Sequence, residues 1–241
     1  MAEQEITKHT KKALKIFGDK ESSFFHKLID FGLEIAIIVF AISLSIWFHN
    51  WSEHKNEQKI AKTFLLGLKD DIQADINDTK EILKDYQDYK EVYTYLSGLD
   101  RDKRPNMDSL KYSFIRVYAS PSLNSHQSRF NGFLSAGKIM TIENDSLTQD
   151  ILNYYQIILP GLLRQEGWWE SRHNSLITYF ADNVKVYKDD MEEFKVVTTT
   201  RGKYITNSII PWSTIFIYHQ NFINEGNKII ARINKMYPNN K

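Results

Sequence analysis

Cysteine is absent from the 241 residues of this chain. Disulfides, thiolate metal sites and thiol nucleophiles are therefore excluded, although a bacterial periplasmic domain of this size does not need them. An excess of one charge is also missing, because 31 lysines and arginines face 30 aspartates and glutamates and leave a formal net charge of +1. Without a basic excess, nucleic-acid binding is disfavoured, and no nucleic-acid partner is predicted.

Recognisable catalytic motifs are missing as well. Ser135 lies between Gly132 and Gly137 in a spacing that differs from that of a nucleophile elbow. Glu170 and His173 have the spacing of a di-iron ligand pair, but no other histidine has an acidic residue three positions before it. We therefore predict a non-enzymatic protein with no metal site and no cofactor. An unrecognised hydrolase is the weaker alternative.

One apolar run is long enough to cross a membrane. The eighteen residues from Phe31 to Phe48 contain a single charge, Glu34. As a helix they span about 27 Å, close to the hydrocarbon thickness of a bilayer. Trp47 and Trp51 follow on one side of the helix, where an aromatic belt at the water interface is expected.

The alternatives for this run are a buried core helix and a cleaved signal peptide. A signal peptide would lie nearer the start and would be followed by a small-residue cleavage site rather than by tryptophan and histidine. We predict a transmembrane helix over residues 28–51 in contact with the lipid bilayer, with Trp47 and Trp51 as interface anchors.

Lysines flank the span unequally, and this bias predicts its orientation. Those before the span are Lys11, Lys12, Lys15, Lys20 and Lys27, and those after it over a comparable distance are Lys55, Lys59 and Lys62. The positive-inside rule then predicts a short cytoplasmic segment, residues 1–27, and a periplasmic domain, residues 52–241. The predicted location is the bacterial inner membrane, crossed once.

Beyond the span the apolar residues recur at helical spacing. The inward positions predicted in the first helix are Ile60, Phe64, Leu68, Ile72, Ile76, Leu83, Tyr86 and Tyr93, and those in the last are Ile215, Tyr218, Phe222, Ile229, Ile233 and Tyr237. This pattern is typical of amphipathic helices packed around a core. The predicted fold class is all-α, with one N-terminal transmembrane helix followed by an antiparallel helical bundle.

Caps and breakers place the predicted helix ends. The first helix continues to about residue 97, and a polar turn covers residues 98–106. Further helices are predicted from a cap at Asp108 or Ser109 to about 119, from 125 to 136 with Gly137 as its stop, from a cap at 144–146 with a kink at Pro160 and Gly161, and over 212–236. Residues 196–205, with three consecutive threonines, are predicted to form a loop or a short hairpin.

Two stretches resemble a family of bacterial single-span membrane proteins, the DUF6090-type proteins of Bacteroidota. The first runs from Gly32-Leu33-Glu34-Ile35 to Asn50-Trp51, and the second joins residues 130–139 to Asn144-Asp145-Ser146-Leu147 and to Asn153-Tyr154-Tyr155. In that family a Gly-Glu pair opens the apolar run, whereas here Leu33 separates Gly32 from Glu34. The resemblance implies one span and a helical domain. It implies no chemistry, because the family is catalogued as a domain of unknown function.

Asp30, Glu34, Ala41 and Ser45 share one stripe of the predicted span. Ala41 and Ser45 have the four-residue spacing of small side chains that lets another helix approach closely. The stripe therefore predicts a protein partner, or a second copy of the chain, bound through the transmembrane helix. The alternative is that Glu34 reaches back to the cytoplasmic interface near Lys27.

Arg164, Trp168, Trp169 and Arg172 follow the Pro160-Gly161 kink and could line a pocket for an anionic or sugar-like ligand. Packing is the favoured alternative, with one tryptophan in the core and the other covering an arginine stem. Arg116 and Arg129 could converge on the same pocket if the bundle folds tightly.

These features favour a membrane-anchored helical scaffold, sensor or accessory subunit of a bacterial envelope complex. One alternative is a subunit of an ion- or proton-coupled membrane machine that uses Glu34 and has the bundle as its stator. Another is a periplasmic domain that senses a small ligand.

Overall fold

The computed structural model describes residues 24–186 and 189–238. Internal contacts divide the chain into two units, Met1–Ile60 and Ala61–Lys241, and each is described here by itself. All regular secondary structure in the described residues is helical, and no strand occurs among them. The predicted all-α fold class is therefore confirmed for this part of the chain.

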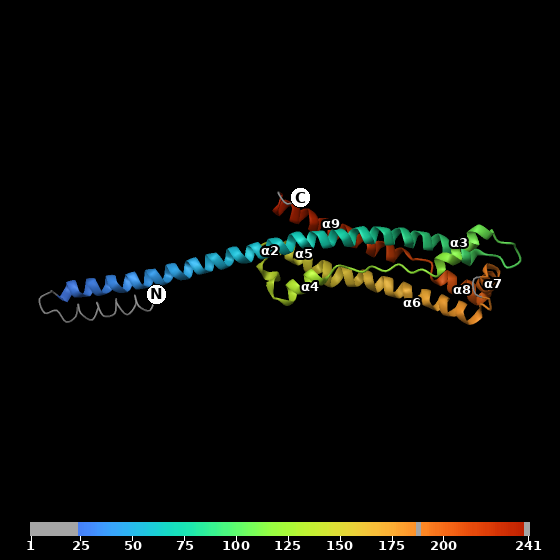
Figure 1. Cartoon of the computed structure of the whole chain (residues 1–241), viewed down its shortest axis with the longest axis horizontal. Coiled ribbons are helices and arrows are strands. Elements are labelled where there is room, and N and C mark those ends of the chain that lie inside the picture. Colours follow the sequence, from blue (N-terminus) through green and yellow to red (C-terminus); the bar gives the residue numbers. More distant parts are fainter. Residues whose placement is uncertain (1–23, 187–188, 239–241) are drawn as a thin grey trace. The chain divides into compact units, whose positions relative to one another are not determined.

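The helices follow one another with short connections (Figure 1). They are α2 (Phe24–Gly98), α3 (Met107–Val117), α4 (Ser128–Ser135), the 3₁₀ helix η1 (Lys138–Thr141), α5 (Asp145–Asn153), the π-helix η2 (Tyr154–Ile158), α6 (Leu159–Asn183), α7 (Asp190–Val197), α8 (Thr200–Ser208) and α9 (Ser213–Met236). One longer connection, residues 119–127 between α3 and α4, has no helix, and we name it the crossing segment.

The first unit consists of α2 as far as Ile60. This part of the helix contains a stretch of eighteen residues that is long and apolar enough to cross a membrane, and only 6% of that stretch is buried. The large apolar side chains from Leu28 to Phe48 stand exposed, for example Phe40 at 67%.

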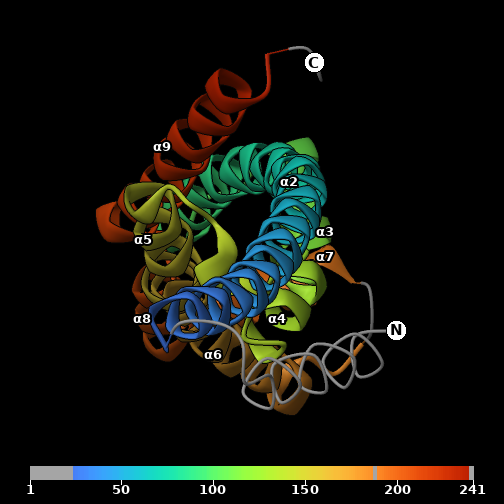
Figure 2. The same ribbon diagram turned by 90° about the vertical axis from the view of Figure 1, so that its left-hand side faces the viewer.

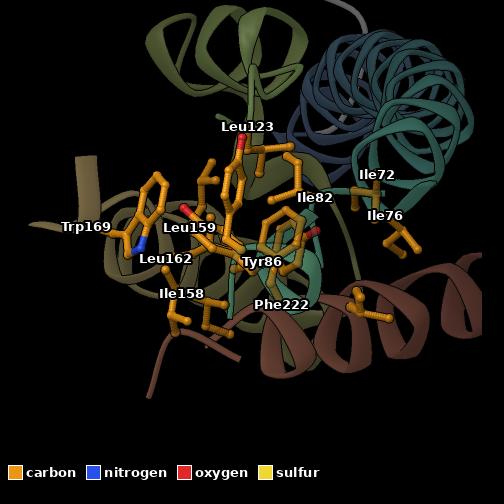
Figure 3. Packing of buried hydrophobic residues seen from close by; sticks show 14 of the residues in the cluster. Ile72, Ile76, Ile82, Tyr86, Leu123, Ile158, Leu159, Leu162, Trp169 and Phe222 are labelled. Carbon is orange, nitrogen blue, oxygen red and sulfur yellow. The ribbon is translucent and has the colours of Figure 1, made fainter. Parts of the chain in front are cut away.

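The second unit is a helical bundle whose core begins at Ala61. The predicted inward positions of α2 are confirmed at Phe64, Leu68, Ile72, Ile76, Tyr86 and Tyr93, which are buried, whereas Ile60 and Leu83 are half-buried. In α9, Ile215, Phe222, Ile229 and Ile233 are buried, and Tyr218 and Tyr237 are half-buried. Figure 3 shows side chains from α2, the crossing segment, α6 and α9 meeting in this core.

Within the bundle, α2 and α6 run in the same direction. The ring of Tyr86 lies 5.3 Å from that of Trp169, and one or two turns further on the ring of Tyr93 lies 6.3 Å from that of His173. A strictly antiparallel bundle, as the sequence predicts, is therefore wrong for this pair. The reason is that the crossing segment carries the chain back along the bundle without forming a helix (Figure 1).

The last helix, α9, is antiparallel to both. Its early residue His219 lies 5.3 Å from Tyr86 between ring centroids, and near its end Tyr237 lies 5.4 Å from the ammonium nitrogen of Lys62, early in the bundle part of α2. Seen end-on, α4 and α9 lie on different sides of the bundle (Figure 2). The antiparallel prediction thus holds for α9.

Side-chain caps set the helix ends, and one of them differs from the prediction. The cap of α3 is Asn106, whose side chain accepts from the backbone N–H of Ser109 at 3.0 Å. Asp108 and Ser109 lie inside the helix, so the prediction of either as the cap is wrong. Asn144 caps α5 as predicted, accepting from the N–H of Leu147 at 2.9 Å. Gly137 ends the α4 region with a φ of 68°, a conformation that favours glycine.

The predicted interruption at Pro160 takes the form of the π-helix η2. Pro160 has no N–H, and its ring would crowd the carbonyl four residues earlier in a regular α-helix. The wider turn lets the N–H of Leu159 bond to the carbonyl of Tyr154, five residues back. The helix therefore continues into α6 instead of breaking.

The prediction of a loop or hairpin over residues 196–205 is wrong. These residues belong to the end of α7 and to α8. The threonines bond to nearby backbone rather than pairing as strands: the Thr198 hydroxyl donates to the carbonyl of Phe194 at 2.7 Å. Thr199 caps α8 by accepting from the N–H of Gly202 at 2.9 Å.

Gly202 permits the tight turn between α7 and α8, and replacing it tests that packing. A Cβ at this position would lie 2.6 Å from the carbonyl oxygen of Val197 and close to that of Val196. We expect Gly202→Ala to lower the free energy of unfolding by about 1–3 kcal/mol, the usual cost of overpacking. Gly167→Ala is the control, because a Cβ there meets nothing within 4 Å. Chemical denaturation that shows the two variants equally stable would contradict the predicted packing.

Candidate functional site

An open groove lies beside α6. Its volume is about 730 Å³, within the range of small-molecule sites. One wall is a face of α6, and the other is the chain that joins α8 to the first turn of α9. The lining residues are Gln165, Trp168, Ser171, Arg172, Ser208, Ile210, Trp212 and Thr214. This set contains one cation, two tryptophans and no carboxylate, and we name it the Trp168 groove.

Contacts from α6 hold Trp212 in place. Its indole Nε1 donates to Oε1 of Gln165 at 3.2 Å. The guanidinium of Arg172 lies over its ring, 4.9 Å from the centroid. Arg172 also donates to the carbonyl oxygen of Ser208 at 3.3 Å. These contacts connect the two walls of the groove and set the distance between them.

The structure separates the four residues that the sequence groups as a ligand pocket. Trp168 and Arg172 line the Trp168 groove, and Trp168 is 55% exposed. Trp169 is fully buried, and its Nε1 donates to the carbonyl of Ile209 at 2.9 Å. Arg164 is exposed and does not line the groove. The separation follows from helix geometry, because successive side chains on a helix point about 100° apart.

Arg116 and Arg129 do not reach this groove. Arg116 bonds to Asp85 at 2.7 Å and to Asp88 at 2.5 Å. Arg129 bonds to Asp71 at 2.8 Å. All three aspartates lie on α2, so these arginines fasten α3 and α4 to that helix instead of lining a pocket.

Two residues of the groove, Gln165 and Trp212, were not among the sequence predictions. Trp212 stands between Pro211 and the start of α9, where the sequence indicates only a helix beginning. Its indole N–H needs an acceptor when it is partly buried, and that requirement is the one signal that sequence reasoning could have used.

The stripe predicted on the span lies along α2. Asp30, Ala41 and Ser45 are exposed, whereas Glu34 is only 8% exposed. The four residues lie within one arc of the helix, as the sequence predicts from their spacing.

The two predicted interface anchors also stand on the surface of α2. Trp47 is 58% exposed and packs edge-on against Phe48 with ring centroids 5.0 Å apart. Trp51 is 48% exposed, and the ammonium nitrogen of Lys55 lies 4.1 Å from its ring centroid. Aromatic rings beside a lysine at the end of an apolar stretch are typical of a membrane interface.

A buried acid–base pair joins α6 to α9. Nδ1 of His219 donates to the carbonyl of Ile215 at 2.7 Å, and Nε2 lies 2.9 Å from Glu166. Because both ring nitrogens face acceptors, the pair holds one proton more than a neutral imidazole and a carboxylate would. Glu166 also accepts from the backbone N–H of Leu123 in the crossing segment at 3.1 Å.

A second buried carboxylate, Asp75 of α2, holds the end of the crossing segment. Asp75 is fully buried and accepts from the Ser125 hydroxyl at 2.7 Å and from the backbone N–H of His126 at 2.9 Å. Nδ1 of His126 lies 2.6 Å from the same carboxylate. This hydrogen bond raises the pKa of the His126 imidazole above its ordinary value.

His173 and Tyr89 bind the other end of the connection. Nε2 of His173 donates to the carbonyl of Val117 at 2.8 Å, and the Tyr89 hydroxyl donates to that of Ala119 at 2.8 Å. Burial lowers the pKa of His173, whose ring stacks on Trp169 at 4.9 Å. His173 thus serves the fold, and no three potential metal ligands come together in the described residues.

The comparisons with known proteins give no match. No family model matches the chain, and neither does any curated protein or solved structure. The resemblance to the DUF6090-type proteins stays a prediction.

The contact between His126 and Asp75 makes stability depend on pH. A pKa raised by folding contributes stability that is fully present below about pH 6.5, the unfolded value, and is lost as pH rises through the folded pKa. We expect His126→Gln to lower the free energy of unfolding more at about pH 6 than at about pH 9. Urea denaturation of both proteins at the two pH values measures this difference.

The control is His49→Gln, because His49 is exposed on α2 before the bundle begins. His173 titrates equally in wild type and variant, so its contribution cancels in the comparison. An effect of His126→Gln that is the same at both pH values would contradict the charged contact.

Proposed function

We propose that this chain is a single-span protein of the bacterial inner membrane and that its helical bundle is a non-enzymatic scaffold or accessory subunit of an envelope complex. The observation that carries the proposal is the exposed apolar stretch of α2. Each exposed large side chain leaves favourable burial of about 1.5–3 kcal/mol unused in water. A stretch of eighteen such positions with only 6% buried therefore favours lipid as its environment.

The two alternatives for this stretch fit less well. The core helix of a soluble protein would be mostly buried, whereas these side chains are exposed. A cleaved signal sequence would end soon after the apolar run, whereas α2 continues to Gly98 without a break in its helix. Trp47, Trp51 and Lys55 at the end of the run support an interfacial position.

The non-enzymatic role is supported by what the buried polar side chains do. Asp75, Glu166 and His173 bond to the crossing segment or to the end of α3, and His219 is paired with Glu166. Ionisable groups in clefts are the usual mark of a catalytic site, but these groups satisfy backbone donors and acceptors inside the bundle. Their chemistry is used by the fold.

Anchoring and orientation can be tested together in cells that express the full chain. We expect alkaline carbonate to leave the protein in the membrane pellet, because a spanning helix is not extracted with peripheral proteins. Protease added to spheroplasts should degrade the bundle, since the lysine bias places it in the periplasm. Extraction by carbonate would overturn the span. A bundle that is cut only after lysis would reverse the orientation.

The stripe of Asp30, Glu34, Ala41 and Ser45 identifies the face on which a partner helix is proposed to pack. Ala41→Leu should reduce the yield of a crosslinked complex several-fold, because a larger side chain blocks close approach of helix backbones. Ala36→Leu is the matched control, since Ala36 is equally exposed but points away from the stripe. Equal yields from the two variants would place the partner elsewhere.

Glu34→Gln separates scaffold from ion-coupled subunit in the same assay. Removing a charge can only ease membrane insertion, so protein levels should not fall. If Glu34 serves ion or proton coupling, the variant keeps the complex but loses its dependence on the ion gradient. A variant identical to wild type in assembly and in ion dependence would remove this alternative.

A further inference from the structure

The Trp168 groove carries an inference that does not depend on membrane anchoring. Three arginines of the bundle have carboxylate partners: Arg116, Arg129 and Arg232. Arg172 has none within ion-pair distance in the described part of the chain, and its hydrogen bond goes to a backbone carbonyl, that of Ser208. A guanidinium has five N–H donors, so most of its hydrogen-bonding capacity is left for another acceptor.

Gln165 adds a second donor in a fixed orientation. The indole N–H of Trp212 is a donor only, so the atom of Gln165 that it meets must be the amide oxygen. The amide nitrogen of Gln165 is therefore the end that remains. The residue as a whole is 5% exposed, yet this nitrogen is not among the buried polar atoms that lack a partner, so it opens onto the groove that Gln165 lines.

The side walls supply flat apolar surfaces. Trp168 is 55% exposed on α6, and Trp212 is half-buried on the opposite wall with Arg172 over its ring. Tryptophan faces stack on planar rings and on the apolar faces of sugars, and such walls with a few fixed polar groups are typical of small-molecule sites. With no acidic residue in the lining, a negative charge meets no opposing carboxylate there.

We propose that the Trp168 groove binds a small carboxylate carried on an aromatic or sugar ring. The carboxylate bonds to the guanidinium of Arg172 and to the amide nitrogen of Gln165, and the ring lies against Trp168. A guanidinium matches the two oxygens of a carboxylate in a bidentate geometry, which makes it the main source of specificity.

The test uses the full chain in detergent, labelled with 5-fluorotryptophan. The five tryptophans give five ¹⁹F resonances, assigned by single substitutions. The probes are benzoate and glucuronate, with benzamide and glucose as uncharged counterparts and inorganic phosphate as a different anion. We expect saturable shifts of the Trp168 and Trp212 resonances with the carboxylates, while Trp47 and Trp51 serve as unmoved references.

Two substitutions examine the proposed contacts. Arg172→Gln should weaken carboxylate binding at least ten-fold, whereas Arg164→Gln, an exposed arginine of the same helix outside the groove, should leave it unchanged. Gln165→Glu keeps an acceptor for the indole N–H of Trp212 but replaces the donor by a negative charge, and it should also weaken binding at least ten-fold. The Trp169 resonance reports on the fold in each variant, because this side chain is fully buried.

Three results would overturn the proposal. The first is the absence of a saturable shift with either carboxylate. The second is an equal response to benzamide or glucose, which would remove the role of the charge. The third is equal affinity in Arg172→Gln and Arg164→Gln. A response to phosphate without one to the carboxylates would reject the proposed ligand class.

Discussion

The backbone of the crossing segment is the constraint on which the rest of the bundle depends. Residues 119–127 form no helix, so their N–H and carbonyl groups lack the internal partners that helices supply. Side chains of α2 and α6 take that place: Tyr89 binds the carbonyl of Ala119, Glu166 the N–H of Leu123, and Asp75 the N–H of His126. An unpaired buried group costs about 1–3 kcal/mol, so these few polar residues make a non-helical segment stable inside a helical bundle.

The same segment determines how the long helices meet. Because it returns the chain along the bundle, α6 starts at the same end as the bundle part of α2 and runs parallel to it. That direction brings Tyr86, Tyr89 and Tyr93, which recur at three- and four-residue steps, against Trp169 and His173. The packing has a cost: the hydroxyls of Tyr86 and Tyr93 and Nδ1 of His173 have no hydrogen-bond partner. Aromatic burial outweighs it here, because rings of this size each bury about 150–250 Å².

Sequence reasoning succeeded where the deciding interactions are local and failed where they are not. The apolar period of α9 and the cap at Asn144 depend on residues three or four apart, and both were predictable. The threonines at 198–200 have β-type composition, but their hydroxyls bond within one turn and stabilise helix ends. Trp168 and Trp169 are neighbours on one helix, so only one can face the core. The choice depends on Ile209, the acceptor for Trp169, and on Trp212 across the groove, some forty residues away along the chain.

These observations divide the polar chemistry of the chain into two classes. Carboxylates and histidines inside the bundle have partners that the fold itself requires, so their presence in the core does not by itself indicate a reaction. The surfaces without a matching partner in the described residues are the apolar stretch of α2 and the cation in the Trp168 groove. Exposed apolar area and a guanidinium without a counter-charge each gain free energy from a molecule outside the chain. What the protein recognises is therefore to be sought at these two surfaces rather than among its buried acids.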